Sequence, residues 1–313
     1  MIPVLRPNLN DVKNTLEETA FPKDIIVEAT GHCNLRCIMC PYPGLNRPKG
    51  EMSAELFRKI VDEVAAVSPE SRLWLAIMGE PLLMGERLIP MIAYAKAQGL
   101  SDVILNSNAT FMTADLAPML IRSGLDRIIL SLDAITRPTY DRVRVGGDFD
   151  RVMRNIHDFI AIRRSLESSK PELVAQFIVM DENEHETEPF KAYWLSQGVT
   201  VKIRPKLGWG KGVPAANLEA MRKEVGRDFA CSWLTRTVSI HWDGTIAQCD
   251  ADHEGVHSPG DIRHQSIKEV WDGELARRRQ RHWNQDFDFD PCKDCNDWLA
   301  GRSYFFHPEE ERK

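Results

Sequence analysis

The sequence predicts an α/β fold, a parallel sheet or barrel, followed by a small α+β module that carries cysteines. Short apolar segments alternate about six times with amphipathic segments as far as residue 205, which is typical of consecutive βα units. Four of the seven cysteines lie in the last third of the chain, and none lies between Cys40 and Cys231. This segregation indicates that the cysteine-containing module is separate from the α/β part.

The composition is that of a globular protein with enough apolar residues for a large core. The chain has 313 residues, 43% of them hydrophobic, and a net charge of -6. Its acidity argues against a nucleic-acid partner and mildly favours neutral or cationic substrates. No apolar run reaches about 18 residues, and the first residues lack the apolar core of a signal peptide. An odd number of cysteines fits poorly with a disulfide framework. We therefore expect a cytoplasmic protein with no membrane or nucleic-acid partner; its oligomeric state stays open.

The order of the elements divides the chain into four segments. Pro3, Pro7 and Pro22 prevent a long helix at the start. The segment after the α/β part is rich in glycine and proline and then turns charged and helix-like, which indicates a linker or a substrate-facing insertion. The expected segments are a lead-in, a barrel, this linker or insertion and the cysteine module, at 1–22, 23–205, 206–230 and 231–313.

Each predicted element rests on its apolar pattern and its flanking residues. The strands are short apolar runs at 24–29, 73–78, 103–105, 127–132, 173–179 and 199–203. The helices have apolar residues at helical spacing and cover 53–67, 88–97, 113–124, 149–162 and 188–197. Ser53 and Thr113 are the expected N-caps of two of them.

The cysteine module has its own local pattern. Two strands at 238–242 and 245–249 flank Asp243-Gly244, which predicts a hairpin with a two-residue turn. A helix is expected at 266–281, and a Cys-x2-Cys turn follows it.

Three thiols lie together directly after the first predicted strand. Cys33, Cys37 and Cys40 form a Cys-x3-Cys-x2-Cys loop with no fourth cysteine nearby. A closed structural metal site needs four ligands, whereas three thiolates on a four-iron cluster leave one iron open. A zinc knuckle completed from elsewhere in the chain is the alternative. In parallel barrels the loops after the strands carry the chemistry, and this loop follows such a strand.

This loop resembles that of the radical S-adenosylmethionine (SAM) superfamily. The resemblance implies a partial six-unit barrel, open on one side, and the loop favours it over a doubly wound sheet. It further implies a [4Fe–4S] cluster with SAM on the open iron, and reductive cleavage of SAM to a 5′-deoxyadenosyl radical that removes a hydrogen atom from a substrate. An electron donor such as flavodoxin or ferredoxin is the implied partner.

The resemblance also extends to residues after the second and third strands. Met78-Gly79-Glu80-Pro81 is similar to the family's Gly-Gly-Glu motif, which implies that Gly79 and Glu80 hold the SAM ammonium. Met78 stands where the family has its first glycine. Asn106-Ser107-Asn108-Ala109 is similar to the family's Thr-Asn-Gly, which implies that Asn108 approaches the ribose.

Further SAM contacts are implied after the fourth strand and in the cysteine loop. Ser131 and Arg144 are the implied ligands of the SAM carboxylate, because a guanidinium binds a carboxylate with two hydrogen bonds. Met39 replaces an aromatic residue that the family places near adenine, and Tyr42 is expected to compensate.

Two cations are the candidates on the substrate side. Lys202 and Arg204 lie two residues apart at the sixth strand and therefore share one face. They are expected to act as anion clamps or as a proton acceptor, with a salt bridge at the rim as the alternative. Asp250, Asp252 and His253 follow Cys249 and are expected near the second cysteine set.

That second set contains four thiols. They are Cys231, Cys249, Cys292 and Cys295. Four thiolates fully ligate a second [4Fe–4S] cluster, although structural zinc uses the same ligands. The segment 260–279, followed by Pro-Cys-Lys-Asp-Cys, resembles the SPASM/Twitch extension of radical SAM enzymes, and four cysteines match the shorter Twitch type. The spacing is similar to that of the 2-deoxy-scyllo-inosamine dehydrogenase type.

The leading functional hypothesis is oxidation of a small polar metabolite, such as a sugar or aminocyclitol, after hydrogen abstraction. A radical epimerase is the second, with Cys249 as hydrogen donor. A maturase of ribosomal peptides is the third; the roughly 23 residues before the first strand are too few for a leader-binding domain, so a partner would supply one. A zinc-binding interaction module is the alternative without catalysis.

Overall fold

The computed structural model describes residues 9–301 and 303–308. Within them, six parallel strands form the barrel wall, and each pairs with its neighbours in chain order. They are β1 (Asp24–Val27), β2 (Arg72–Leu75), β3 (Val103–Ser107), β4 (Arg127–Ser131), β5 (Glu172–Val179) and β6 (Thr200–Pro205). The predicted partial barrel is confirmed, with strand ends shifted by a few residues. Part of the predicted lead-in, residues 1–8, lies outside the described residues.

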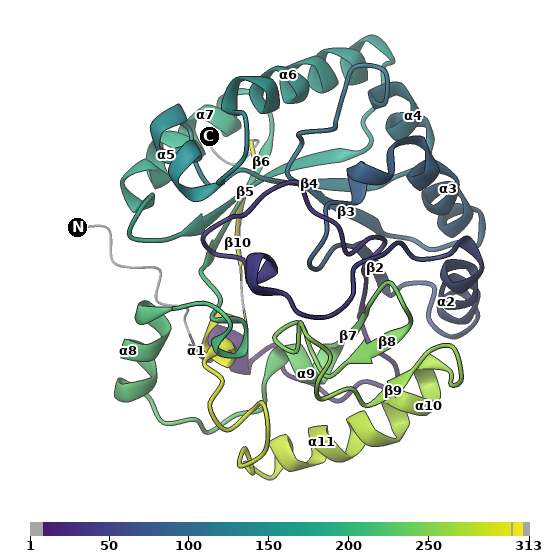
Figure 1. Cartoon of the computed structure of the whole chain (residues 1–313), viewed down its shortest axis with the longest axis vertical. Helices are drawn as coiled ribbons and strands as arrows, with labels where there is room; N and C mark the ends of the chain where they lie inside the picture. The colour runs from purple at the N-terminus through teal and green to yellow at the C-terminus, as the bar shows by residue number, and fades with distance from the viewer. Residues whose placement is uncertain (1–8, 302, 309–313) are drawn as a thin grey trace.

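Helices cover the outside of this wall (Figure 1). They are α2 (Ala54–Val67), α3 (Ile89–Ala97), α4 (Ala117–Arg122), α5 (Arg137–Val143), α6 (Phe149–Ser165) and α7 (Thr187–Ser196), with the short 3-10 turns η2 (Pro81–Leu88) and η3 (Glu184–Glu186). The short helix α1 (Leu9–Lys13) lies elsewhere, beside the C-terminal part, and the 3-10 turn η1 (Tyr42–Gly44) belongs to the cysteine loop. Ser53 caps α2 as predicted, because its side chain accepts a hydrogen bond from the Leu56 amide. The Thr113 hydroxyl also accepts a hydrogen bond from the amide three residues later, Leu116, at 3.4 Å, although regular helix begins only at Ala117.

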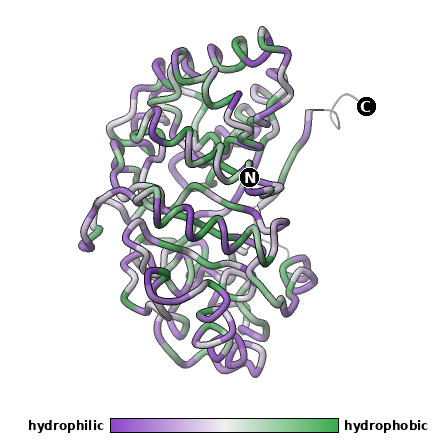
Figure 2. The backbone as a smooth tube through the Cα atoms, turned by 90° about the vertical axis from the view of Figure 1, so that its right-hand side faces the viewer, coloured by the Kyte–Doolittle hydropathy of each residue, from purple (hydrophilic) through white to green (hydrophobic). Residues whose placement is uncertain are grey.

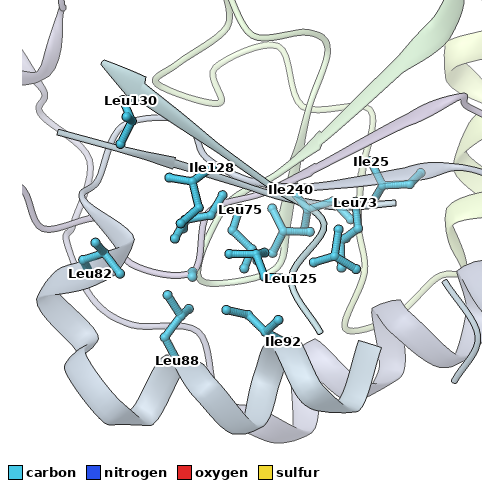
Figure 3. Packing of buried hydrophobic residues seen from close by; sticks show 14 of the residues in the cluster. Ile25, Leu73, Leu75, Leu82, Leu88, Ile92, Leu125, Ile128, Leu130 and Ile240 are labelled. Carbon is cyan, nitrogen blue, oxygen red and sulfur yellow. The ribbon is translucent and has the colours of Figure 1, made fainter. Parts of the chain in front are cut away.

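The main core lies between the outer face of the sheet and these helices. Successive residues of a strand point to opposite faces, so alternate positions face the helices. Figure 3 shows this layer, to which both strands and helices contribute. Along the peripheral helices apolar and polar residues alternate, as the tube of Figure 2 shows, because each helix buries one face only.

The C-terminal part adds further elements to the barrel. They are η4 (Trp209–Lys211), α8 (Ala216–Glu224), α9 (Ser232–Arg236), β7 (Thr237–Ile240), β8 (Thr245–Ala247), β9 (Gly260–Asp261), α10 (Ile267–Asp272), α11 (Glu274–Trp283), η5 (Asp297–Ala300) and β10 (Tyr304–Phe306). Among the described residues they extend one continuous sheet, in the order β10-β6-β5-β4-β3-β2-β1-β7-β8-β9. β7 runs parallel to β1, and β10 runs antiparallel to β6, so both edges of the barrel are covered.

Two local predictions in this part need correction. The hairpin between β7 and β8 has a longer turn than the predicted Asp243-Gly244, because the Gly244 amide donates to the His241 carbonyl oxygen and His241 itself pairs with Thr245. Gly244 has a φ of +97°, the left-handed conformation that closes such turns. The predicted single helix at 266–281 is two helices broken at Gly273, where an added Cβ would lie 2.7 Å from the Glu269 carbonyl oxygen.

Buried contacts fasten the C-terminal part to the loop that follows β1. The Glu28 carboxylate is completely buried and accepts hydrogen bonds from two guanidinium nitrogens of Arg47. It also accepts one from the Trp242 amide, 3.1 Å away. The Glu254 carboxylate in turn accepts hydrogen bonds from the backbone amides of Asn46 and Arg47. The loop is therefore held by residues from both halves of the chain.

None of the helices within the described residues is long and apolar enough to cross a membrane.

Truncating the central strand should destabilise both halves of the chain together. Ile25 is completely buried in β1, the strand that pairs with both β2 and β7. We expect Ile25→Ala to cost about 2–5 kcal/mol of unfolding free energy, with one cooperative transition. Urea unfolding followed by tryptophan fluorescence and by circular dichroism tests this. Val67→Ala is the control at an exposed apolar position and should cost far less. Separate transitions for the two probes would contradict the shared core.

Candidate active site

The cysteine loop crosses the centre of the barrel mouth, between β1 and α2 (Figure 1). Two of its backbone amides, those of Arg36 and Ile38, donate to the carbonyl oxygens of Val145 and Val143. The Cys33 amide donates to the Tyr42 hydroxyl at 2.9 Å. Tyr42 therefore shapes the loop from within, while backbone pairing with the end of α5 holds it from outside.

The three thiols of this loop lie in an apolar setting. They pack in a cluster with Leu35, Met39, Val143 and Met180. Burial raises the pKa of Cys33 to about 11 and that of Cys40 to about 12. Apolar surroundings of this kind keep water from the sulfur atoms, which suits a cluster whose potential depends on its solvation.

Arg144 is a buried cation beside the loop. Its guanidinium forms an ion pair with the fully buried Asp133. Its Nη1 also lies 3.5 Å from the Cys37 sulfur. The Nε atom is buried without a hydrogen-bond partner among the described residues. One donor of this guanidinium is therefore still available to a ligand, and the side chain lines the central cavity.

Gly79 packs against the backbone just before the cysteine loop, and Glu80 holds the neighbouring segments together. An added Cβ on Gly79 would lie 1.7 Å from the Thr30 carbonyl oxygen, so only glycine fits there. The buried Glu80 carboxylate accepts hydrogen bonds from the Leu82 amide (3.1 Å), the Ser107 hydroxyl (2.8 Å) and the Asn108 amide (2.7 Å). Its oxygens thus fix the segments after β2 and β3 to each other.

Backbone strain lies in the same segment. Ile77 has a φ of +90°, a conformation that a β-branched residue rarely adopts. It lines the central cavity. Such strain persists only where the surrounding structure enforces it and is most common at functional sites.

The residues after β3 divide between the loop and the cavity. The Asn108 side chain donates to the Asn34 side chain at 2.9 Å and so ties down the cysteine loop. Asn106, two residues earlier, lines the cavity instead, together with Ser131. No role for Asn106 was predicted from the sequence. Its signal was a polar residue inside a buried parallel strand, where apolar residues are the rule.

Unsatisfied polar atoms mark this part of the cavity. Asn106 Oδ1 and Gln176 Oε1 are buried, and neither has a hydrogen-bond partner among the described residues. Both side chains line the cavity. Buried polar atoms of this kind cost free energy unless a ligand or water satisfies them, so they indicate where a polar ligand binds.

A cavity of about 520 Å³ lies inside the barrel, and its lining includes residues from the loop of the first cysteine set and residues next to the second set. Residues of the cysteine loop, Met39 and Cys40, form part of its wall, and Asp250 and Trp233 of the C-terminal part form another. Trp209 also lines it and donates from its ring nitrogen to the Met39 carbonyl oxygen at 3.0 Å. The cavity is thus built by both halves of the chain.

Lys202 and Arg204 line this cavity, as the alternation along β6 predicted. Neither side chain forms a hydrogen bond or an ion pair with any residue that the structure describes. Burial, followed by repulsion from Arg204 and Arg72, lowers the pKa of Lys202 to about 7. Burial also raises the pKa of Asp250, another lining residue, to about 6.

The four C-terminal thiols lie close together. Besides burial, the nearby thiols of Cys292, Cys231 and Cys295 raise the pKa of Cys249. Cys249 does not line the central cavity, although its neighbour Asp250 does. The Gln248 side-chain amide donates to the Cys292 sulfur at 3.2 Å.

Two cations stand near this second set. Arg227 donates to the Cys292 carbonyl oxygen at 3.1 Å, and Arg278 donates to the Gln248 side chain. Positive groups and N–H donors beside thiolates suit a four-thiolate iron–sulfur cluster, whose overall charge is negative.

Both cysteine sets are compatible with iron–sulfur clusters. Within residues 9–301 and 303–308, no three His, Cys, Asp or Glu side chains are arranged to hold a metal ion. In a four-iron cluster each thiolate binds a different iron, so its cysteines stand farther apart than the ligands of one ion. The three-thiol loop beside a cavity with orphaned polar atoms also fits a cluster with an exogenous polar ligand.

Comparisons with known proteins agree with this geometry. The family model described as the radical SAM superfamily matches residues 27–188. The SPASM model, described as an iron–sulfur cluster-binding domain, matches residues 231–296. Together they span both cysteine sets.

Curated relatives are distant. The tungsten-containing aldehyde ferredoxin oxidoreductase cofactor-modifying protein of Pyrococcus furiosus is 22% identical over 315 residues, which covers 88% of this chain and 87% of that protein. A probable GTP 3′,8-cyclase of Methanococcus maripaludis is 29% identical over 175 residues, and the match covers 56% of each chain.

Solved structures share the fold. BtrN in complex with AdoMet and 2-DOIA is 17% identical with a TM-score of 0.59, covering 90% of this chain and 94% of BtrN. SuiB of Streptococcus suis, bound to the precursor peptide SuiA, is 13% identical with a TM-score of 0.66, covering 90% of this chain and 71% of SuiB. The chain therefore belongs to the radical SAM superfamily and carries a SPASM iron–sulfur domain at its C-terminal end.

Proposed function

We propose that this radical SAM enzyme oxidises a small polar metabolite, such as a sugar or aminocyclitol, at a carbon that bears a hydroxyl or amino group. The observation that carries the proposal is the position of the cavity. It is lined by Cys40 of the first cysteine set and by Asp250, which directly follows Cys249 of the second set. A substrate in this cavity would lie between the two sites of electron transfer.

The cofactors of this proposal are SAM and two [4Fe–4S] clusters. When bound, they supply the reducing electron, the hydrogen-abstracting 5′-deoxyadenosyl radical and an acceptor for the electron left on the substrate. The first cysteine set, Cys33, Cys37 and Cys40, would hold one cluster. The second cluster would be held by the four C-terminal cysteines, Cys231, Cys249, Cys292 and Cys295. An electron donor of the flavodoxin or ferredoxin class would reduce the first cluster.

The chain's own residues divide into those that face SAM and those that hold the loop. Ser131 and the free Nε–H of Arg144 are proposed to bind the SAM carboxylate, since both residues line the cavity. Gly79, Glu80, Asn108 and Tyr42 are proposed to act on SAM through the loop that they support.

The oxidation balances as the loss of two electrons and two protons from the substrate. The carbon would give up a hydrogen atom to the 5′-deoxyadenosyl radical, with 5′-deoxyadenosine as the product, and one proton and one electron would then leave the substrate radical. A C=O or C=N bond forms as the C–H and the O–H or N–H bonds break. Lys202 and Arg204 are proposed to face the substrate from β6.

A radical epimerase is the second candidate, because Cys249 could return a hydrogen atom if it were free of the cluster. Cys249 stands among three other thiols and does not line the cavity, which favours its role as a ligand. A peptide maturase is the third candidate; the likeness to SuiB concerns the fold only.

Protein purified without oxygen should hold about eight irons and eight sulfides, for two four-iron clusters. Replacing Cys33, Cys37 and Cys40 together by alanine should remove about half of the iron and abolish SAM cleavage. Replacing Cys292 and Cys295 should instead remove the other half and spare SAM binding. Metal analysis and SAM binding measure these outcomes. Zinc without iron in the wild type would contradict the proposal.

Arg144→Lys should weaken SAM binding about tenfold or more with both clusters retained, because lysine keeps the charge but loses the planar donor set. Arg142→Lys is the matched control at an exposed position of α5 and should bind SAM normally. Equilibrium binding of SAM and iron content are the measurements. Unchanged SAM affinity in Arg144→Lys would remove this residue from the pocket.

Cys249→Ala separates oxidation from epimerisation. If Cys249 is a ligand, the variant should have a disturbed auxiliary iron signal, as should Cys231→Ala. Wild-type turnover in deuterated water should then leave no deuterium at the reacting carbon. Electron paramagnetic resonance and mass spectrometry of the product measure both effects. An intact cluster in Cys249→Ala, together with deuterium at an inverted carbon, would favour the epimerase.

A further inference from the structure

We infer that the substrate carries an anionic group, a carboxylate or a phosphate, which Lys202 and Arg204 bind from β6. The inference rests on the proposed function, because it assigns the substrate to the same cavity. It reverses the expectation of a neutral or cationic substrate that the net charge of -6 suggests. The local charge of the cavity differs from the charge of the whole chain.

The cavity is positively charged inside an acidic protein. Among its described lining residues are five cations, Arg72, Arg144, Lys202, Arg204 and Arg236, and two carboxylates, Asp24 and Asp250. A surplus of one sign in a low-dielectric cleft attracts ligands of the opposite sign.

Three of these cations already have carboxylate partners. Asp24 forms ion pairs with Arg72, at 2.6 Å, and with Arg236, at 2.9 Å. Arg144 is paired with Asp133. Three of the five cations therefore have a carboxylate partner without a ligand, although Asp24 is shared by two of them.

Lys202 and Arg204 differ from the other three. Neither is within ion-pair distance of a carboxylate among the described residues, although Lys202 is only 7% exposed. Asp250 accepts a hydrogen bond from Ser239. Asp250, Asp133 and Asp297 attract the Arg204 guanidinium, but none of them forms an ion pair with it. A buried cation without a counterion is costly. The bound ligand is therefore expected to supply the missing negative charge.

SAM does not account for this need. Its single carboxylate is offset by its own ammonium and sulfonium charges, and the proposed site for that carboxylate lies at Ser131 and Arg144. Two further cations on one strand, two residues apart and on one face, match a second anionic group.

Aromatic rings surround the lysine. The Lys202 ammonium lies 5.7 Å from the ring centre of Trp74 and 5.9 Å from that of Phe305, which belongs to β10. Apolar walls exclude water and so strengthen an ion pair formed with the ligand.

The charge of Lys202 depends on its neighbours. Its pKa of about 7 results from burial and from repulsion by Arg204 on β6, Arg72 on β2 and Arg127 on β4, against attraction by Asp24 on β1. A nearby anion favours the protonated lysine. Anion binding should therefore weaken as the pH rises through about 7, where the lysine of the ligand-free site loses its proton.

Equilibrium binding to the anaerobic holoenzyme with SAM, but without reductant, tests the inference. The probes are gluconate, glucose 6-phosphate and sorbitol, which present a carboxylate, a phosphate and no charge on similar polyols. At least one anion should bind and sorbitol should not; the tighter anion identifies the charged group. Lys202→Met and Arg204→Met should each weaken anion binding about tenfold or more while SAM affinity stays unchanged.

Control variants separate the site from general effects. Lys223→Met removes an exposed lysine on α8 and should bind the anion like the wild type. Lys202→Arg should keep the affinity but lose its weakening above about pH 7, since arginine stays charged. Without ligand, Lys202→Met should resist urea at least as well as the wild type, because a buried unpaired charge is removed.

Each other outcome overturns the inference. Binding of sorbitol as tight as that of the anions would do so, as would failure of both anions to bind. Loss of SAM affinity in both methionine variants would assign the two cations to SAM. The proposed function is judged separately by 5′-deoxyadenosine formation under reducing conditions, so either idea can fail while the other stands.

Discussion

The rest of the structure depends on β1, which pairs with β2 on one side and with β7 on the other and then leads directly into the cysteine loop. Glu28 follows this strand, and its buried carboxylate joins Arg47 of the loop to the Trp242 amide of the C-terminal part. A buried charge that loses one partner costs several kcal/mol, about 3–5 in measured cases. The loop and the C-terminal hairpin therefore share one set of contacts.

The interior of the barrel contains an apolar layer of side chains and, next to it, a polar cavity. Ile104, Ile129 and Val174 pack together on the inner face with Trp74 beside them. Complete barrels fill their interior with such side chains. Here the inner positions toward the strand ends are polar instead, which leaves a cavity of about 520 Å³. The open mouth is filled by the cysteine loop and by residues of the C-terminal part.

Several features of this cavity are unfavourable in the ligand-free protein. Asn106 and Gln176 have unpaired buried oxygens, Ile77 is strained, and Lys202 lacks a counterion among the described residues. Each of these features lowers the stability of the ligand-free protein. Polar and anionic ligands would give the two oxygens and the lysine the partners that they lack. Their concentration in one place connects the energetics of the fold to its proposed chemistry.

The sequence by itself determined most of the local elements and the family to which the chain belongs. The alternating apolar segments predicted the six strands, Ser53 marked the start of α2, and the thiol spacing indicated the radical SAM family. These features depend on neighbours in sequence, so a local pattern encodes them. Only the tertiary structure decided that β7 adjoins β1 and that Glu80 turns to Ser107 rather than to the cavity. Which cations lack an ion-pair partner also depends on contacts between side chains that are distant in sequence. A local sequence pattern does not encode such contacts.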